Sequence, residues 1–201
     1  EHPAVRAVLG WAKCERGLEI HHDGDLPARS GLGSSSSFTV GLVHALKALK
    51  GNYATKEELA KDAINIEQNI IKENVGSQDQ TLAAFGGFNR IEFKHNDSFD
   101  VAPVILGRDR LEELQSHLML CFTGLSRIAS EVAKSKIENF KKRETELKNM
   151  GAMVEQAMHI LHDPRTALEE FGKLLHQSWL YKRSLSDMVS TPEIDSIYEA
   201  A

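Results

Sequence analysis

The sequence predicts an α+β protein with two lobes, and two observations lead to that class. Helix-like and strand-like patterns mix in the first half of the 201 residues, whereas the second half is nearly all helical in its apolar spacing. The composition also shifts over residues 103–113, between a predicted hairpin and the helical half. We therefore expect one domain over residues 1–105 and a second over residues 115–201.

The first lobe is predicted to contain short helices and strands. Helical spacing predicts a helix over 3–12, and the alternating run at 18–22 predicts a strand. Gly51 is a typical C-terminal cap, and Thr55 with Glu58 forms a capping-box pattern at the start of the next helix. The other predicted elements are helices over 38–50 and 78–85 and a hairpin of strands 88–93 and 99–104.

The second lobe is predicted to begin with a buried strand at 117–122 and then to be helical. Asp163 and Thr191 each precede a proline, which is the pattern of an N-cap followed by proline at the first helical position. The helices are predicted at 127–161 with a break near Gly151, at 164–186, and from Pro192 onward.

Composition narrows the class of protein before any motif is considered. The chain is 41% hydrophobic and 26% charged, which suits a soluble domain with a real core. Its formal net charge is -5 and it has no long basic run, so nucleic acid is not expected as its main partner. No apolar run reaches about 18 residues, so neither a membrane span nor a membrane partner is expected.

The cysteines and histidines show no pattern of a disulfide or zinc site, which is typical of a cytoplasmic protein. Cys14 and Cys121 lie far apart and are typical of reduced, buried thiols in a cytoplasmic protein, which is the location we expect. The nine histidines show no zinc spacing, so His21 and His22 are expected to be structural.

A glycine- and serine-rich loop over residues 25–37 joins the strand predicted at 18–22 to the next helix. Backbone N–H groups at the start of that helix, with the positive end of its dipole, make an anion site. Gly31 and Gly33 would let the backbone approach a ligand, and serine hydroxyls bind phosphate oxygens or a hard cation. The pattern is neither a Walker A loop nor a nucleophile elbow, and by composition alone it leaves an ordinary capped loop open.

Two carboxylates on adjacent predicted helices could face one cleft. Glu67 lies on the helix that begins after Thr55, and Asp79 lies in the first turn of the following one. One carboxylate could hold Mg²⁺ while the other receives a hydroxyl proton. The alternative is structural, since an aspartate in a first turn is favoured by the helix dipole and a glutamate on a charged helix is usually solvated.

Together these patterns resemble the GHMP kinases. Pro27–Ser36 resembles their second motif, P-x-x-x-G-L-G-S-S-A, with Ser36 where the family usually has alanine. Glu67 followed by Gly76–Gln80 matches a family arrangement of a helical glutamate and then a glycine-containing turn that ends in Asp-Gln. Further motifs at 20–31, 75–80, 84–89 and 123–130 resemble the D-glycero-D-manno-heptose 7-phosphate kinases within that superfamily.

The resemblance implies a fold and a role for the matching residues. It implies a two-lobed fold whose N-terminal part is like ribosomal protein S5 domain 2 and whose C-terminal part is helix-rich and ferredoxin-like. Ser35 and Glu67 would bind Mg²⁺, and Asp79 would be the catalytic base. Residues expected to bind the ATP phosphates are Arg29, Gly31, Leu32, Gly33, Ser34, Ser35 and Ser36.

Substrate contacts are less sharply defined by the sequence. Gln78 is one candidate. Arg127, which follows a strand and a glycine turn at the start of a predicted helix, could hold a sugar phosphate or simply lie on the surface.

The implied activity is magnesium-assisted phosphoryl transfer from ATP to the anomeric hydroxyl of a sugar, with D-glycero-D-manno-heptose 7-phosphate giving the 1,7-bisphosphate. Another C1 sugar kinase of the fucose or galactose type is an alternative, as is a non-catalytic module that binds a nucleotide or sugar phosphate. The expected partner is the small-molecule substrate, and a homodimer stays open. The chain is expected to start after the first family motif and to stop before the third, so that it would lack parts of a complete enzyme.

Overall fold

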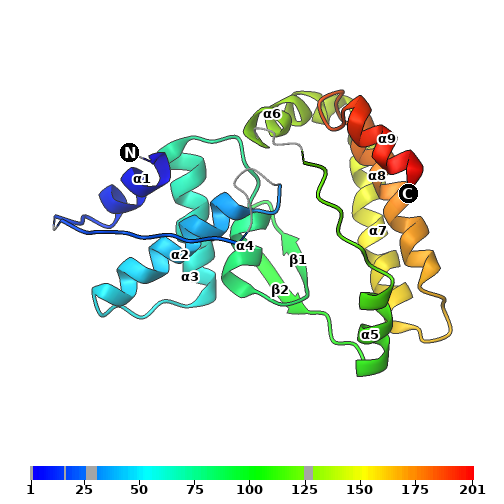
Figure 1. Cartoon of the computed structure of the whole chain (residues 1–201), viewed down its shortest axis with the longest axis horizontal. Helices are drawn as coiled ribbons and strands as arrows, with labels where there is room; N and C mark the ends of the chain where they lie inside the picture. The colour runs from blue at the N-terminus through cyan, green and yellow to red at the C-terminus, as the bar shows by residue number, and fades with distance from the viewer. Residues whose placement is uncertain (1, 16, 26–30, 125–128) are drawn as a thin grey trace. The chain divides into compact units, whose positions relative to one another are not determined.

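The computed structural model describes residues 2–15, 17–25, 31–124 and 129–201. The described residues form helices and a single two-stranded sheet, so the α+β class is confirmed (Figure 1). The chain divides into two compact units, Glu1–Gly87 with Gly124–Ala133 and Phe88–Thr123 with Lys134–Ala201. The domain limits of 1–105 and 115–201 stay a prediction.

The first unit is a cluster of helices around one apolar core. Val8, Val43, Leu46, Leu59 and Ile66 are buried together in it. The core therefore binds the successive elements of this unit to one another, which fixes where their polar residues lie. Its elements are α1 (Pro3–Trp11), α2 (Ser34–Leu49), α3 (Lys56–Asn65), the π-helix η1 (Ile66–Ile71) and α4 (Gln78–Phe85).

The helix-capping predictions in this unit are confirmed. Gly51 has φ +72° and its N–H bonds to the carbonyl of Ala48, while the Asn52 N–H bonds to that of Lys47, which is a Schellman motif. Thr55 and Glu58 form the expected reciprocal capping box.

The four serines after Gly33 are not part of the loop, contrary to the sequence prediction. Gly33 has φ +72° and is the N-cap, and α2 begins at Ser34 rather than at Phe38. Serine is well suited to a first helical turn, and the left-handed backbone at Gly33 turns the chain into the helix four residues earlier than expected. The serines are consequently spread around the first turn of a helix, on different faces.

The strand predicted at 18–22 is wrong. These residues are extended and exposed, and no strand pairs with them within the described ranges. Alternating apolar residues form a strand only when a neighbouring strand satisfies their backbone groups, and local sequence does not supply that neighbour. The segment is instead anchored by the His22 ring, which packs edge-on against Phe38 at 4.9 Å between ring centroids.

The second unit combines the hairpin with several helices. Strands β1 (Asn89–Phe93) and β2 (Phe99–Pro103) pair antiparallel as predicted, with Ile91 opposite Val101. Thr191 caps the last helix by accepting a hydrogen bond from the Ile194 N–H, also as predicted. The helices are α5 (Arg108–Ser116), α6 (Ala129–Asn139), the 3-10 turn η2 (Phe140–Lys142), α7 (Glu144–His162), α8 (Glu169–Ser184) and α9 (Pro192–Ala200).

Three helix predictions in this half are wrong. The long helix breaks at η2, whereas Gly151 lies inside α7 because an isolated glycine weakens a helix without ending it. No helix begins at Pro164, since Asp163 ends α7 and accepts a hydrogen bond from the Arg165 N–H in a turn. Helix α5 falls in the stretch that composition marked as a boundary.

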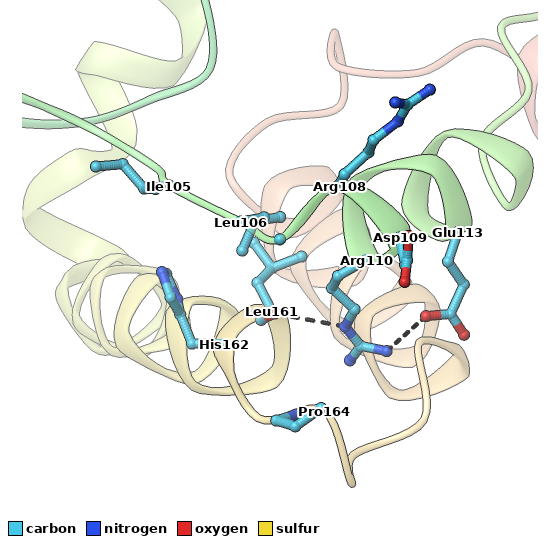
Figure 2. A pocket seen from close by; sticks show the side chains of 10 residues that line it. Ile105, Leu106, Arg108, Asp109, Arg110, Glu113, Leu161, His162 and Pro164 are labelled. Carbon is cyan, nitrogen blue, oxygen red and sulfur yellow. Dashed lines mark hydrogen bonds and ion pairs between the residues drawn. The ribbon is translucent and has the colours of Figure 1, made fainter.

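Arg110 fastens α5 to the end of α7 (Figure 2). Its guanidinium donates to Glu113 and to four backbone carbonyl oxygens at the C-terminal end of α7 and in the turn after it. Carbonyls at the end of a helix have no partner within the helix, so this arginine acts as a cap supplied from another element. The acceptors are the carbonyls of Ile160, Leu161, Asp163 and Thr166.

The buried strand predicted at 117–122 is wrong. The segment has no strand pairing in the part of the chain that is described, and Met119 and Leu120 are 87% and 80% exposed. Cys121 is exposed too, so its predicted burial is wrong, while Cys14 is half-buried, and neither cysteine forms a disulfide bond. As at residues 18–22, the apolar residues predicted a buried strand. Such a strand needs a neighbouring strand to pair with, and the local sequence does not supply one.

Among the described residues, no helix combines the length and the apolar character needed to cross a membrane.

Candidate active site

The N-terminus of α2 offers backbone donors to an anion. Gly31 and Gly33 have φ values of +80° and +72°, which only glycine adopts without strain, and the first turn of α2 carries no acidic residue. The first N–H groups of a helix have no partner within it, and the helix dipole adds positive potential there. This end of α2 is chemically suited to phosphate oxygens.

Asp79 lies directly against this turn. A Cβ atom added to Gly33 would meet the Asp79 Cγ at 3.3 Å and its Oδ2 at 3.5 Å. Asp79 is the second residue of α4 and is exposed. The structure therefore brings a solvent-accessible carboxylate to the glycine turn at the start of α2, which is the proximity that the sequence could only imply.

Glu67 is held in the interior between α2, η1 and α4. Its exposed fraction is 1%, and its Oε2 accepts hydrogen bonds from the Ser36 Oγ at 2.9 Å and from the Gln80 Nε2 at 2.5 Å. Ser36 lies in the first turn of α2 and Gln80 in the first turn of α4. One carboxylate thus joins the two helix N-termini.

The donors and acceptors around Glu67 do not balance. The Glu67 Oε1 and the Gln80 Oε1 are buried and have no hydrogen-bond partner within the described ranges. Nor does a lysine, arginine or histidine that the structure describes form an ion pair with Glu67. A buried carboxylate without a counter-charge is costly, so this cluster calls for a cation or a further donor.

A second carboxylate reinforces the negative potential. The pKa of Glu73 is raised above its usual value, first because the group loses hydration and then because of the charge of Glu67, with His2 acting in the opposite direction. Glu73 closes the π-helix η1, since its N–H bonds to the Glu67 carbonyl at 3.0 Å after Lys72 turns the chain at φ +62°. A cation near Glu67 would reduce the electrostatic repulsion between the Glu67 and Glu73 carboxylates.

The site rests on a rigid support of side chain to backbone hydrogen bonds. Gln68 donates to the Val75 carbonyl at 3.0 Å and to the Ser77 Oγ at 3.2 Å, which fixes the loop that leads into α4. Thr39 and Thr81, both fully buried, donate to carbonyls one turn back in α2 and α4. These bonds give the two buried hydroxyls a partner, and π-helical turns like η1 are frequent at functional sites.

The donor set fits a hard cation. Mg²⁺ takes oxygen ligands, keeps several waters and is usually bound through one or two carboxylates together with substrate phosphates. Glu67 Oε1 and Gln80 Oε1 are unpartnered oxygens next to the anion-binding end of α2. By contrast, the described residues contain no group of three or more His, Cys, Asp or Glu side chains that could hold a metal alone. A cation here would depend on phosphate oxygens for the rest of its ligands.

The predicted site residues are distributed as follows. Gly33 meets Asp79, and Ser36 meets Glu67, so these predictions converge on one place. Ser35 is exposed, and its role as a metal ligand stays a prediction, as do those of Gly31, Leu32, Ser34 and Gln78. Arg29 and Arg127 lie outside the described residues.

Sequence reasoning missed two supporting residues and one helical element. Gln80 was part of a matched motif but received no role, and Gln68 and the π-helix that carries Glu67 went unnoticed. The position of Gln80 next to Asp79 could have indicated its role. Neighbouring residues of a helix point in different directions, so an exposed Asp79 favours a Gln80 that faces inward.

Comparison with known proteins identifies the first unit. Residues 3–87 match the family model of the GHMP kinases N terminal domain. These residues belong to that family. In this GHMP kinase domain the matched segment contains the glycine turn, Ser36, Glu67, Asp79 and Gln80.

Relatives extend the similarity beyond the GHMP domain. The chain is 31% identical to the D-glycero-alpha-D-manno-heptose 7-phosphate kinase of Campylobacter jejuni, over 98% of this chain and 58% of that protein. It is 25% identical to the mevalonate kinase of Thermococcus sibiricus, over 92% of this chain and 56% of that one. The chain therefore spans a little more than half the length of these relatives.

A solved structure agrees with the fold. The crystal structure of a D-glycero-D-manno-heptose 1-phosphate kinase from Bacteriodes thetaiotaomicron superposes with a TM-score of 0.68 at 26% identity. The match covers 91% of this chain and 55% of that one. The predicted GHMP kinase fold is confirmed.

Proposed function

We propose that this chain is the part of an ATP-dependent sugar kinase that binds nucleotide and sugar phosphate, and that the reaction transfers a phosphoryl group to the anomeric hydroxyl of D-glycero-D-manno-heptose 7-phosphate. One observation carries the proposal. An exposed carboxylate, Asp79, and a buried carboxylate with an unpartnered oxygen, Glu67, lie at the same glycine turn and helix N-terminus. The similarity to the heptose 7-phosphate kinase supports the choice of sugar.

Each residue would have a distinct task. The first N–H groups of α2 would bind the ATP phosphates, with the glycines allowing close approach. Glu67 and Ser35 would hold Mg²⁺, which when bound offsets the negative charge of the phosphates. Asp79 would orient the acceptor hydroxyl and accept its proton, and the rigid first turns of α2 and α4 would keep that carboxylate in line with the nucleotide.

Because this chain is expected to lack parts of a complete enzyme, the test is ADP release from ATP and Mg²⁺ by a version extended at both ends, with heptose 7-phosphate, fucose, galactose, mannose or no sugar. We expect release above the background without sugar only for the heptose phosphate, because the proposal assigns the site to that sugar. Nucleotide binding without ADP release for any sugar would favour a binding module instead.

Replacing the proposed base sharpens this assay. Asp79→Asn should lower turnover by about 100- to 10,000-fold, since general base catalysis contributes that much, and should leave nucleotide affinity within about twofold. Asp109→Asn is a matched control, because Asp109 is also an exposed aspartate at the second position of its helix, α5. Normal turnover in Asp79→Asn would contradict the assigned role.

A further inference from the structure

The Glu67 carboxylate is held by one oxygen only. Ser36 and Gln80 both donate to Oε2, and no described residue contacts Oε1 with a hydrogen bond. All three side chains are at most 5% exposed, so water does not compete freely for these bonds. Two donors from different helices on the same oxygen fix the rotation of the carboxylate plane and leave the other oxygen in a defined place.

We propose that Ser36 and Gln80 are positioning residues that present the Glu67 Oε1 to a divalent cation. The inference rests on the proposed function, in which Glu67 is a metal ligand. Neither residue touches the reacting atoms in this account. Each acts through Glu67 by removing the alternative orientations that an unrestrained carboxylate would sample, and a restrained ligand loses less entropy when it binds a metal.

Ser36 is suited to this task because its side chain points into the interior, toward Glu67. Among the four serines at the start of α2, Ser36 is buried, whereas Ser35 and Ser37 are exposed. It also occupies the position where the GHMP kinase motif usually has alanine, so alanine should fit this helix turn without disturbing it. The hydroxyl of Ser36 is therefore an addition that serves Glu67, and Ser36→Ala deletes one hydrogen bond rather than a structural side chain.

Gln80 links the positioning of Glu67 to the placement of Asp79. The two neighbours occupy one turn of α4, and Gln80 is fully buried while Asp79 is exposed against Gly33. A shift of α4 would move both side chains together. Gln80→Met keeps the length of the side chain while removing both its N–H donors and its unpartnered Oε1. Ser36→Ala is therefore the variant that isolates a single hydrogen bond to Glu67.

The test measures Mn²⁺ binding to the protein–ATP complex from the electron paramagnetic resonance spectrum of protein-bound Mn²⁺. Mn²⁺ with ATP and no protein is the reference, because ATP alone also removes the free Mn²⁺ signal. We expect Ser36→Ala and Gln80→Met each to weaken Mn²⁺ binding about tenfold, the lower end of the effect of a residue that orients a metal ligand. The Mg²⁺ concentration for half-maximal ADP release should rise by about the same factor. Ser37→Ala, an exposed neighbour in the same helix, should leave Mn²⁺ affinity unchanged.

The outcomes separate this inference from the function on which it rests. Lower thermal stability with unchanged Mn²⁺ affinity in Ser36→Ala and Gln80→Met would reduce both residues to structural roles and overturn the inference. Glu67→Gln should lose Mn²⁺ binding. If it does so while the other two variants bind normally, the positioning role alone fails. Unchanged Mn²⁺ affinity in Glu67→Gln, or a wild-type chain that binds no Mn²⁺ with ATP, would overturn the proposed cation site and the inference together.

Discussion

Two polar clusters, one around Arg110 in the second unit and one around Glu67 in the first, differ in whether their donors and acceptors are all paired. In the second unit, the Arg110 side chain is 13% exposed, and every nitrogen of its guanidinium donates to a carbonyl or to Glu113. In the first unit, Glu67 accepts two bonds on one oxygen, while its other oxygen and that of Gln80 stay unpartnered among the described residues. A satisfied cluster stabilises a fold, whereas an unsatisfied one is maintained at a cost that a ligand can relieve.

The same comparison explains why the pocket beside Arg110 does not rank as an active site. It has a volume of about 790 Å³ and is lined by α5 and the end of α7 (Figure 2). The guanidinium within it is already committed to backbone carbonyls, as the dashed line to Leu161 illustrates. The unpartnered oxygens in the first unit therefore mark Glu67, rather than this pocket, as the place where a ligand is missing.

Removing Arg110 should have the largest effect on stability. Arg110→Met removes the donor of three carbonyls and of Glu113, whereas the Asp163 carbonyl keeps its hydrogen bond from the Thr166 N–H. We expect the free energy of unfolding to fall by about 3 kcal/mol in a urea titration. Arg108→Met is the matched control, because Arg108 is exposed on the same helix and its pair with Glu112 is at the surface, where such pairs contribute about 0–1 kcal/mol. Equal losses in the two variants would show that the Arg110 cluster is not a structural clamp.

Gly33 tests the contact between the turn and the proposed base. Gly33→Ala and Gly31→Ala both force alanine into a left-handed backbone, at about 1–2 kcal/mol each. Only the Cβ at position 33 also meets Asp79, whereas the space at position 31 is open. We expect Gly33→Ala to be the less stable of the two in thermal unfolding. Identical stabilities would mean that Asp79 yields freely and is not held against the turn.

The Thr55 capping box provides a third, solvent-exposed polar cluster with a smaller expected effect. Thr55→Ala should lower the free energy of unfolding by about 1 kcal/mol at pH 7 because it removes an N-cap. Hydrogen bonds from the Thr55 backbone N–H and hydroxyl lower the pKa of Glu58 below its ordinary 4.5. Its contribution is therefore present above pH 4.5 and is lost as pH falls through the lowered folded value.

The difference in free energy of unfolding between wild type and Thr55→Ala should consequently shrink as pH drops below 4.5. It should not vanish, because the Thr55 hydroxyl still accepts a hydrogen bond from the Glu58 backbone N–H. Glu57→Gln is the control, since Glu57 lies next to Glu58 and pairs with Lys61 at the surface. A stability difference for Thr55→Ala that is the same at pH 3 and pH 7 would exclude the coupling to Glu58.

Features that depend on a few neighbouring residues could be predicted from the sequence. Features that depend on pairing between distant segments could not. The Gly51 cap, the Thr55 box and the Thr191 cap are encoded within a few residues each, and all are present. The strands expected at 18–22 and 117–122 failed because a strand depends on a partner elsewhere in the chain.

The site was predictable to the same extent. The motif indicated the glycine turn, Glu67 and Asp79, which are brought together. It did not reveal that Ser36 rather than Ser35 faces Glu67, because that depends on the residue at which α2 begins and on how the helix packs. The π-helix η1 also went unpredicted, since its hydrogen bonding leaves no mark on apolar spacing.

The most direct test of the account is thermal unfolding of wild type and Glu67→Gln in ATP, with Mg²⁺ or with a chelator. Without metal, Glu67→Gln should be the more stable protein, because it replaces a buried charge that lacks a counter-ion with a neutral amide. Adding Mg²⁺ should raise the melting temperature of wild type by about 3–6 °C, as expected at roughly ten times the dissociation constant, and should leave the variant unchanged. A variant that is less stable without metal and still gains stability from Mg²⁺ would contradict the assignment of Glu67 to a cation site.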